Sequence, residues 1–553
     1  MFTPRPVDLP RTYATPPRLQ PADLWLDGRA GLRWPDDQPS TGADAHRYPD
    51  PTALTALLAG RWNLSSDQVI VTAGADEAID RACRAFLAPG RRAVLTDPTF
   101  TMLPRYTQLA GAETFTVPWP DGELPADRLV ETMGTESGLL AVVSPNNPTG
   151  AVATADQLLD LAHRCPRALL LVDLAYVEFA DQDPTDLLLE RANILVVRTF
   201  SKAWGLASAR VGYAMGRSEV IDALRAAGGP FPTAASSLAR AEYRWRNSAE
   251  ALPRRMAQIG RERFRLRRLL RATGLEVPES QANFLLARGP RSSWLADGLV
   301  GLGIGVRRLD DDAVRISLPG DATVFRRLWS ACRTVLSPQA LLLDMDGVLA
   351  DVSRSYREAI RLTARALGVV VSADDIAAAK SLAGSNNDWL VTRRLVQAAG
   401  SDVSQATVTR RFEDIMTAQQ LWRRERLIPD PDRLRRLAGR LPLAVVTGRP
   451  LADAQRFLSD HGLTDLTSVL VTMDDAPAKP DPAPVQLALN RLGVRRAWML
   501  GDTPDDILSA RAAGVLPLGI TAPGDPAGTV HRLLTTGAAR VLEGFTDIEE
   551  MLP

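Results

Sequence analysis

The stretch Thr199-Phe-Ser-Lys-Ala-Trp-Gly-Leu-Ala-Ser-Ala-Arg210 contains one of only three lysines in a chain of 553 residues. Lysine and arginine together number 65, so almost all positive charges are arginines. The three lysines are Lys202, Lys380 and Lys479. A lysine amine can lose its proton and attack a carbonyl carbon, whereas a guanidinium stays charged. A lysine kept among so many arginines therefore indicates amine chemistry at position 202.

The neighbours of Lys202 indicate which molecule the amine meets. Ser201 offers a hydroxyl and Arg210 a guanidinium, and both suit a phosphate group close to the amine. An aldehyde cofactor that carries a phosphate would use both features. The stretch is typical of a lysine that binds pyridoxal 5'-phosphate. The alternative is that Lys202 is an ordinary lysine that persists by chance.

Apolar runs alternate with helical patterns on both sides of this stretch. Runs at 93–96, 139–143, 168–172 and 194–198 predict strands, and a further strand is expected at 69–72. Alternation of this kind indicates a mostly parallel sheet covered by helices, with ligands at the carboxyl ends of the strands.

Polar and aromatic residues follow several of these predicted strands. A carboxylate at the end of a buried strand, as at Asp173, is costly unless it pairs with a cation, and a protonated pyridine nitrogen would be one. Asn147 and Tyr176 could hydrogen-bond the ring hydroxyl, and Phe100 could stack on the ring. The alternative is that these residues are a helix cap, a turn and core aromatics.

A phosphate site is expected at the strand-to-helix turn Gly74-Ala75-Asp76. Small residues let backbone amides approach a phosphate there, and a helix N-terminus favours negative charge.

Composition narrows the class of protein. The chain is 45% hydrophobic and 24% charged with zero formal net charge, which does not favour a nucleic-acid partner. Three widely spaced cysteines fit neither a disulfide framework nor a zinc site. We find no apolar run of membrane-spanning length and no signal core. The composition predicts a cytoplasmic enzyme of two to four domains.

The second half of the chain carries a different set of strand-end residues. An apolar run from residue 340 delivers Asp344 and Asp346, which can converge where the chain bends at Gly347. Two carboxylates there favour a divalent cation such as Mg²⁺. Later runs end in Thr447 and in Asp502, and Lys479 lies between them.

Residues 20–335 resemble fold-type I, class I/II aminotransferases, most closely the histidinol-phosphate aminotransferases. The resemblance rests on the segments already quoted together with 47–51, 98–100, 146–150, 282–284, 305–307 and 314–317. It implies that Lys202 binds the cofactor aldehyde and then moves the proton, and that Asp173 holds the pyridine nitrogen protonated. The expected cofactor-binding residues are Tyr48, Gly74, Ala75, Asp76, Phe100, Asn147, Asp173, Tyr176, Ser201 and Arg210.

The same resemblance implies a homodimer and an anionic substrate. Tyr48 would reach the cofactor phosphate of the other subunit. Arg315 occupies the position that meets the anionic end of the substrate, and Arg307 the position of a second phosphate-binding arginine. The alternative for Arg307 is a surface residue at the end of a strand.

Residues 340–553 resemble phosphatases of the haloacid dehalogenase superfamily. The resemblance implies that Asp344 is the nucleophile and Asp346 the general acid and base. Thr447 and Lys479 would bind the phosphoryl oxygens. Magnesium would be held by Asp344, Asp346 and Asp502, with Asp506 just outside the ligand set.

A helical insert between the first two phosphatase motifs resembles a cap that restricts the site to small metabolites. Lys380 falls within it, and we expect an exposed lysine at a helix end, with a substrate-facing lysine as the alternative.

The expected fold is α/β throughout: a fold-type I aminotransferase fused to a Rossmann-like phosphatase with a helical cap. The predicted segments are an N-terminal arm, a large cofactor-binding domain, a small domain, a linker with the first phosphatase strand, the cap and the phosphatase core. Their bounds are 1–45, 46–225, 226–336, 337–351, 352–436 and 437–553.

Three hypotheses of function follow. The first is a bifunctional enzyme of amino acid biosynthesis that transaminates a phosphorylated oxo metabolite, of the imidazole-acetol phosphate type, and then hydrolyses the phosphate from the product. The second keeps both activities, with an ordinary 2-oxo acid and an unrelated phosphate ester as substrates. The third makes one half a non-catalytic binding module.

Overall fold

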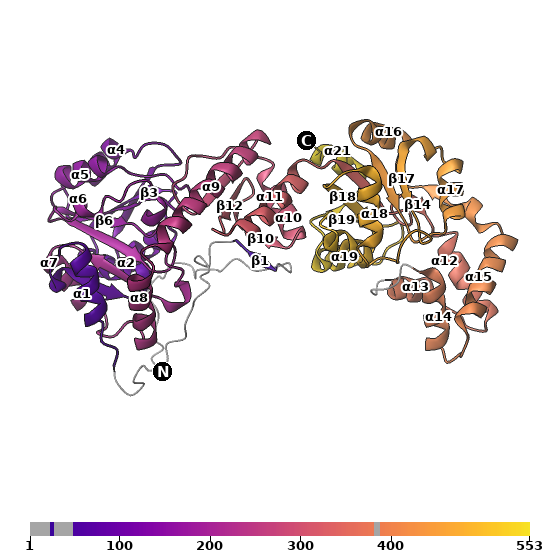
Figure 1. Ribbon diagram of the computed structural model, residues 1–553, viewed down its shortest axis with the longest axis horizontal. Helices are drawn as coiled ribbons and strands as arrows, with labels where there is room; N and C mark the ends of the chain where they lie inside the picture. Colours follow the sequence, from indigo (N-terminus) through magenta and orange to yellow (C-terminus); the bar gives the residue numbers. More distant parts are fainter. Residues whose placement is uncertain (1–22, 27–47, 381–386, 553) are drawn as a thin grey trace. The chain divides into compact units, whose positions relative to one another are not determined.

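The computed structural model describes residues 23–26, 48–380 and 387–552 (Figure 1). Most of the predicted N-terminal arm lies outside these residues. The chain forms two compact units. Of the described residues, the first contains 26, 48–289 and 306–326, and the second contains 23–25, 290–305, 327–380 and 387–552. Among the described helices, none combines the length and the apolar character needed to cross a membrane.

A seven-stranded sheet forms the centre of the first unit. Its strands β3 to β7 run parallel, and β8 runs antiparallel to both β7 and β2. The mostly parallel sheet expected from the sequence is confirmed, whereas β4 and β8 were not predicted. In sheet order the strands are β2 (Val69–Thr72), β8 (Gly212–Met215), β7 (Ile194–Thr199), β6 (Ala168–Asp173), β5 (Gly138–Val143), β3 (Arg92–Asp97) and β4 (Glu113–Pro118).

The central strands of this sheet are buried along their whole length. Every residue of β5, β6 and β7 is buried, which is why these segments read as continuous apolar runs without alternation. Helix α2 (Gly74–Phe86) packs its small apolar face on the sheet. The other helices are α1 (Thr52–Arg61), α3 (Met102–Leu109), α4 (Ala126–Met133), α5 (Ala155–Arg164), α6 (Thr185–Leu188), α7 (Ser218–Ala226), α8 (Ala235–Asn247) and α9 (Ala251–Ala272).

A smaller antiparallel sheet completes the first unit. It has the order β11 (Arg307–Asp310), β12 (Ala313–Ser317), β9 (Phe284–Arg288). In its register Arg307 lies opposite Arg315. Directly opposite residues of an antiparallel pair project from the same face, so the two arginines predicted from the sequence point the same way.

The second unit is built on a six-stranded sheet in which all the strands are parallel. Strand β13 lies between β16 and β18, so the polar residues that follow these three strands meet at one edge. In sheet order the strands are β17 (Thr467–Val471), β16 (Leu443–Val446), β13 (Ala340–Leu343), β18 (Ala497–Gly501), β19 (Leu516–Ile520) and β20 (Val541–Leu542). Helices α16 (Pro431–Arg440), α17 (Leu451–Asp460), α18 (Ala483–Leu492), α19 (Pro504–Ala512), α20 (Thr529–Thr536) and α21 (Phe545–Met551) belong to the same unit.

The helical insert predicted after the first phosphatase strand is present. Helix α12 (Tyr356–Ala366) packs against α14 (Asp388–Ala398) and α15 (Gln405–Ala418), and α13 (Ala373–Lys380) contacts α14. We call these four helices the cap. A short antiparallel pair, β14 (Ala350–Asp351) and β15 (Arg426–Leu427), joins the two ends of the insert and was not predicted.

The second unit also includes helix α10 (Ser292–Gly301), strand β10 (Ile304–Gly305), which pairs with β1 (Leu24–Trp25), and the end of helix α11 (Ala322–Leu336). The indole of Trp498 on β18 donates to the carbonyl of Thr334 at 2.8 Å and meets the Trp294 ring edge to face at 5.1 Å. The compact units therefore divide the chain elsewhere than at 336/337. The six predicted segments remain predictions.

Candidate active sites

A cavity of about 380 Å³ opens at the carboxyl end of the seven-stranded sheet. It brings together most of the residues singled out in the first half of the sequence. Those that line it are Ala75, Asp76, Phe100, Asn147, Asp173, Tyr176, Ser201, Lys202, Arg210, Arg307 and Arg315. Gly74 and Tyr48 do not line it.

Lys202 lies in the turn after β7. Its amine is 5.5 Å from the centre of the Tyr176 ring, which in turn packs edge to face on Phe284 at 5.1 Å. Phe200, two residues before Lys202, is completely buried and packs on Trp204. An anchored aromatic so close to the lysine holds the turn in place and directs the amine into the cavity.

Asp173 is the last residue of β6, and its side chain points into the same cavity. It is 4% exposed, and its Oδ1 accepts a hydrogen bond from the backbone N–H of Ala175 at 3.0 Å. Burial raises the pKa of Asp173 to about 7, although that hydrogen bond lowers it. A cation beside this carboxylate would restore its ionised form.

The phosphate corner predicted from the sequence is assembled around Arg210. Its Nη1 donates to Ser201 Oγ at 3.4 Å and its Nη2 to Asp76 Oδ2 at 2.7 Å. Gly74 has φ +80°, and a Cβ there would lie 2.5 Å from Arg210 Nη2. Gly74 therefore acts by leaving room for the guanidinium beside the start of α2.

The two arginines of the small sheet reach the cavity from β11 and β12. Arg315 is 2% exposed and donates to the Oδ1 of Asn147. Arg307, opposite it in the register, is half-buried. Asn147, expected to contact the cofactor ring, contacts Arg315 in this structure.

Tyr48 lies apart from this cavity. It is 80% exposed and stacks on Phe231 with 4.6 Å between ring centres. Its role at the phosphate site of a second subunit stays a prediction. Tyr106 of α3, which the sequence reasoning missed, does line the cavity, and burial raises its pKa to about 12. Its spacing of six residues from Phe100 gave no periodic signal.

The residues of this cavity fit pyridoxal 5'-phosphate. The site has an amine at Lys202, a buried carboxylate at Asp173 that lacks a full counter-charge, and a hydroxyl and guanidinium beside the N-terminus of α2. The fit rests on the Asp173 carboxylate above all, because such a group is stable at the end of a buried strand only beside a cation.

A second pocket lies at the carboxyl edge of the six-stranded sheet, beneath the cap. The predicted residues that line it are Asp344, Asp346, Lys380, Thr447, Lys479 and Asp502. Residues that the sequence reasoning missed line it as well: Val352, Tyr356, Arg357, Asp388, Trp389, Gly448, Arg449, Pro450 and Thr503.

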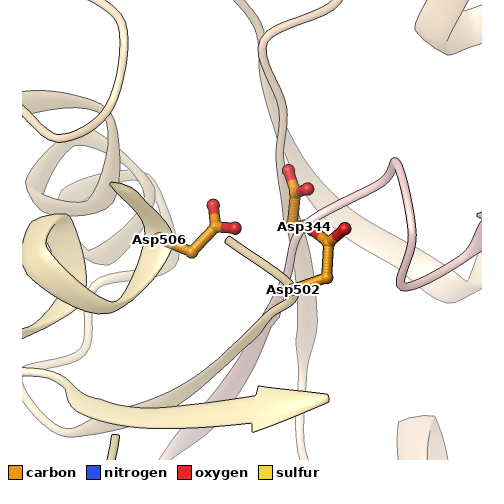
Figure 2. Close-up of side chains that lie close together, drawn as sticks. All are labelled: Asp344, Asp502 and Asp506. Carbon is orange, nitrogen blue, oxygen red and sulfur yellow. The ribbon is translucent and has the colours of Figure 1, made fainter. Parts of the chain in front are cut away.

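Three carboxylates gather at this edge, from Asp344, Asp502 and Asp506 (Figure 2). Ligand oxygens of the three lie within 4.8 Å of one another. Two glycines allow the approach: a Cβ at Gly347 would lie 2.1 Å from Asp502 Oδ2, and one at Gly501 would lie 2.2 Å from Asp506 Cβ. Three hard oxygen donors fit a divalent cation such as Mg²⁺.

The Lys479 amine partly neutralises this cluster. It donates to Asp344 Oδ1 at 2.6 Å and lies 2.5 Å from Asp506 Oδ1. Burial, ahead of the opposing effect of Lys479, raises the pKa of Asp344 to about 7. Burial and the neighbouring carboxylates hold the pKa of Asp502 well above its usual value. One lysine therefore does not supply enough positive charge for three carboxylates, of which Asp344 and Asp506 are buried and Asp502 is half-buried.

The carboxylate cluster differs from the predicted set of metal ligands at one residue, because it contains Asp506 in place of Asp346. The sequence placed Asp346 among the ligands and Asp506 outside them, whereas the structure groups Asp506 with Asp344 and Asp502. Asp506 joins because it lies in the first turn of α19, directly after β18. The carboxylate of Asp346 is engaged elsewhere, since Arg449 Nε donates to its Oδ1 at 2.6 Å.

Arg449 and its second partner, Glu425, were not predicted. Arg449 Nη1 donates to Glu425 Oε2 at 2.9 Å, and both side chains are 2% exposed. The signal was present in the sequence, because Arg449 follows Thr447 by two residues at the end of β16. In a chain so rich in arginine, one more arginine was not conspicuous.

The expectation of an exposed Lys380 is wrong. The lysine side chain is 17% exposed, lines the pocket and lies 2.7 Å from Asp388 Oδ1. Burial lowers the pKa of Lys380, but the nearby carboxylates, Asp388 first, outweigh burial and raise it. The lysine therefore brings a positive charge into the pocket from the cap.

Two family models match the chain. The family model "aminotransferase class I and II" matches residues 36–331, and the model "haloacid dehalogenase-like hydrolase" matches residues 338–514. The chain belongs to the class I and II aminotransferase family, and carries in addition a haloacid dehalogenase-like hydrolase domain. Both families are enzymatic, and the fold class expected from the sequence is confirmed.

Three relatives cover different shares of the chain. An imidazoleglycerol-phosphate dehydratase of Phytophthora nicotianae is 43% identical over 217 residues, which are 37% of this chain and 48% of that protein. An aromatic amino acid aminotransferase of Thermobifida fusca is 37% identical and matches 51% of this chain and 81% of that protein. A histidinol-phosphate aminotransferase of Dinoroseobacter shibae is 34% identical, with shares of 53% and 84%.

A solved structure supports the fold alone. The histidinol-phosphate aminotransferase of Sinorhizobium meliloti, a complex with pyridoxal 5'-phosphate, aligns with a TM-score of 0.50 and 23% identity. The alignment covers 57% of this chain and 91% of that one.

Proposed function

We propose that this chain is a bifunctional enzyme that transaminates a phosphorylated oxo metabolite and then hydrolyses the phosphate ester of the product. The substrate would be of the imidazole-acetol phosphate type, converted to histidinol phosphate and then to histidinol. The observation that carries the proposal is the pairing of Arg307 with Arg315 across β11 and β12.

Like charges directly opposite in an antiparallel pair repel each other, so an anion between two arginines on one face of a ladder would stabilise both. Both line the cavity that contains Lys202. A phosphate dianion can accept several N–H donors at once and so suits two guanidiniums better than a single carboxylate does. The relatives that act on histidinol phosphate support the same substrate.

At the aminotransferase site, bound pyridoxal 5'-phosphate would supply an aldehyde and an electron sink for amino transfer. Lys202 would bind that aldehyde covalently between turnovers and carry a proton at its Nζ during the reaction. Asp173 would keep the pyridine nitrogen protonated. Ser201, Arg210 and the backbone amides at the start of α2 would hold the phosphate. The exposed Tyr48 would complete that phosphate site in a second subunit of a homodimer.

At the hydrolase site, Asp344 would attack phosphorus through its carboxylate, and Asp346 would protonate the departing alkoxide and then activate water. Lys479 and Thr447 would bind phosphoryl oxygens. The cluster of Asp344, Asp502 and Asp506 would bind Mg²⁺, which offsets the charge of the phosphate.

A second candidate for the first activity is transamination of an aromatic 2-oxo acid, because a relative with that name is 37% identical. A carboxylate in place of the phosphate would then lie between Arg307 and Arg315. The two candidates predict opposite preferences for phosphorylated substrates.

The test supplies the purified protein with pyridoxal 5'-phosphate, L-histidinol phosphate and 2-oxoglutarate. We expect glutamate to form by transamination, and inorganic phosphate to be released when Mg²⁺ is present and not after its removal by a chelator. Lys202→Ala should abolish glutamate formation alone, and Asp344→Asn should abolish phosphate release alone. Transamination of phenylpyruvate but not of the phosphorylated compound would favour the second candidate.

A further inference from the structure

Among the described residues that line the hydrolase pocket, Asp388 is the one carboxylate that comes from the cap. It is the first residue of α14, and its side chain is 7% exposed. Capping of the helix does not require it, since the Oδ1 of Asn387 accepts the hydrogen bond from the backbone N–H of Leu390 at 3.0 Å. A buried carboxylate that serves no helix cap needs another reason to be there.

The other carboxylates that line the pocket come from the core. Asp344 is paired with Lys479, and Asp346 with Arg449. Asp502 lies in the candidate cation cluster. Among the residues that the structure describes, the Lys380 amine is the ion-pair partner found for Asp388, and it reaches Oδ1. A carboxylate can accept several hydrogen bonds, so one ammonium group leaves Asp388 with capacity for another donor.

Asp388 lies on the side of the pocket where the organic part of the substrate would bind. A phosphoryl group must lie against Asp344, at the edge of the core sheet, for the nucleophile to reach phosphorus. The organic part of the ester then extends toward the cap, where Asp388, Arg357 and Trp389 line the pocket. Arg357 is paired with Asp525 at 3.2 Å. Once Lys380 turns to the phosphoryl group, the negative charge of Asp388 favours an organic part that carries a positive charge.

We propose that Asp388 binds a protonated amine on the organic part of the phosphate ester, so that the hydrolase site selects the aminated product over its oxo precursor. This inference rests on the proposed function, because transamination is the step that creates the amine. The Lys380 amine lies 2.7 Å from Asp388 Oδ1, where the substrate amine would bind. When the phosphoryl group is bound, its oxygens offer Lys380 a second anion, and its flexible stem allows the exchange.

Selection of the amine would impose an order on the two reactions. The oxo ester and the amino ester differ at one carbon, where a neutral carbonyl becomes a charged ammonium group. Hydrolysis of the oxo ester would remove the phosphate that Arg307 and Arg315 require. A hydrolase that needs the ammonium group spares the oxo ester until amino transfer is complete.

The competing interpretation is that Asp388 only positions Lys380, which then binds the phosphoryl group. The two roles differ in what the loss of the Asp388 charge does to esters with and without an amine. A positioning role lowers hydrolysis of both esters by the same factor. A recognition role lowers hydrolysis of the aminated ester and leaves the other nearly unchanged.

The experiment compares phosphate release from L-histidinol phosphate and from its deamino analogue, 3-(imidazol-4-yl)propyl phosphate, by the full-length holoenzyme with Mg²⁺. We expect the wild type to prefer the amine by about 10- to 100-fold in kcat/KM, as for loss of a hydrogen bond between charged groups. Asp388→Asn should bring the ratio close to one, and Asp388→Glu should retain part of the preference. The matched control is Asp414→Asn, which changes an exposed carboxylate of the cap outside the pocket.

An equal loss on both esters in Asp388→Asn would overturn the inference in favour of positioning. Equal hydrolysis of both esters by the wild type would overturn it without any variant. If the wild type hydrolyses p-nitrophenyl phosphate but neither imidazole ester, the proposed substrate is wrong. The comparison of O-phosphoethanolamine with ethyl phosphate then decides the role of Asp388 by the same ratio.

Discussion

Arg449 donates from Nε to Oδ1 of Asp346 at 2.6 Å and so holds the carboxylate of the proposed general acid and base, which is not a member of the cluster of Asp344, Asp502 and Asp506. The opposite end of the guanidinium is paired with Glu425, which is equally buried. Removal of one partner of a buried ion pair leaves an uncompensated charge, at a cost of about 3–5 kcal/mol.

We therefore expect Arg449→Met to lower the free energy of unfolding of the second unit by about that amount and to slow phosphate release. The double variant Arg449→Met/Glu425→Gln should regain much of the stability, because no charge is left buried, but not the activity, because Asp346 stays unsupported. Urea unfolding followed by phosphatase assays checks both. Equal instability of the single and double variants would contradict this account of the pair.

Lys202 is predicted to link pyridoxal 5'-phosphate to the protein. Treatment of the wild type with borohydride should attach a pyridoxyl group to the peptide that contains Lys202 and bleach the visible absorption. Lys202→Ala and Lys202→Arg should show no attachment, because neither side chain has an amine that can lose its proton. Mass spectrometry of the digested protein is the measurement. A reducible group on the same peptide in Lys202→Ala would show that the assignment is wrong.

Asp173 gives the cofactor site a pH dependence whose sign follows from its pKa. Burial raises the pKa of this carboxyl to about 7 in the cofactor-free protein, so below pH 7 it is mostly protonated. A protonated carboxyl cannot pair with the pyridinium, and its proton must leave before the ion pair forms. Affinity for pyridoxal 5'-phosphate should therefore rise as the pH increases through about 7.

The matched control for this pH dependence is Asp173→Asn, which keeps the shape and lacks the titration. The variant should bind more weakly above pH 7 and lack the part of the pH dependence that belongs to Asp173. Fluorescence titration of the cofactor-free proteins between pH 5.5 and 8.5 measures the difference. Parallel pH profiles for the two proteins would exclude Asp173 as the titrating group.

Arg307 is predicted to distinguish phosphorylated from unphosphorylated oxo substrates. Arg307→Ala should lower kcat/KM for the phosphorylated compound. The expected loss of transition-state stabilisation is about 1.5–3 kcal/mol, the value of a hydrogen bond to a charged group. The unphosphorylated analogue should be affected far less. Arg308→Ala is the matched control, because Arg308 follows Arg307 on the same strand and projects from the other face. Wild-type turnover that is equal for both compounds would rule out a phosphate clamp.

Trp294 should stabilise the second unit, which contains the hydrolase site, although this residue lies within the segment matched by the aminotransferase family model. It packs on Trp498, and the neighbouring Asp297 accepts from Arg540 Nε at 2.6 Å. Trp294→Ala should lower the free energy of unfolding of the second unit by about 3–5 kcal/mol, as for removal of a buried aromatic side chain. Thermal inactivation of phosphate release is the measurement, with Trp294→Phe as the milder control. Unchanged inactivation would mean that the hydrolase sheet is stable without α10.

Strand-end residues account for much of what could be predicted from the sequence. Asp173, Lys202, Asp344 and Asp502 were found because each follows an apolar run, and the carboxyl ends of parallel strands meet at one edge whatever the loops do. Strands β4 and β8 were missed for the opposite reason. Strand β4 is largely exposed, and β8 (Gly-Tyr-Ala-Met) begins with a glycine, so neither has a clear apolar pattern.

The sequence could not predict which charged residues form ion pairs with each other. Nothing in the local sequence separates Arg449 from the other arginines, or shows that Asp346 turns to it while Asp506 joins Asp344. Those outcomes depend on which side chains a bend at Gly347 and the first turn of α19 bring within hydrogen-bond distance. Lys380 is a further case, because a lysine at the end of a helix is buried or exposed according to what packs over it.

The sequence by itself determined the two kinds of chemistry, the positions along the chain of the strands that carry them, and most of the residues at the ends of those strands. It could do so because hydrophobic periodicity and side-chain chemistry are local properties. Only the tertiary structure decided which charges face each other: Arg307 with Arg315, Arg449 with Asp346, and Lys380 with Asp388. Electrostatic interactions at 2.5–4 Å depend on the register of strands and the packing of helices that lie far apart in the chain, and these become fixed when the cores form.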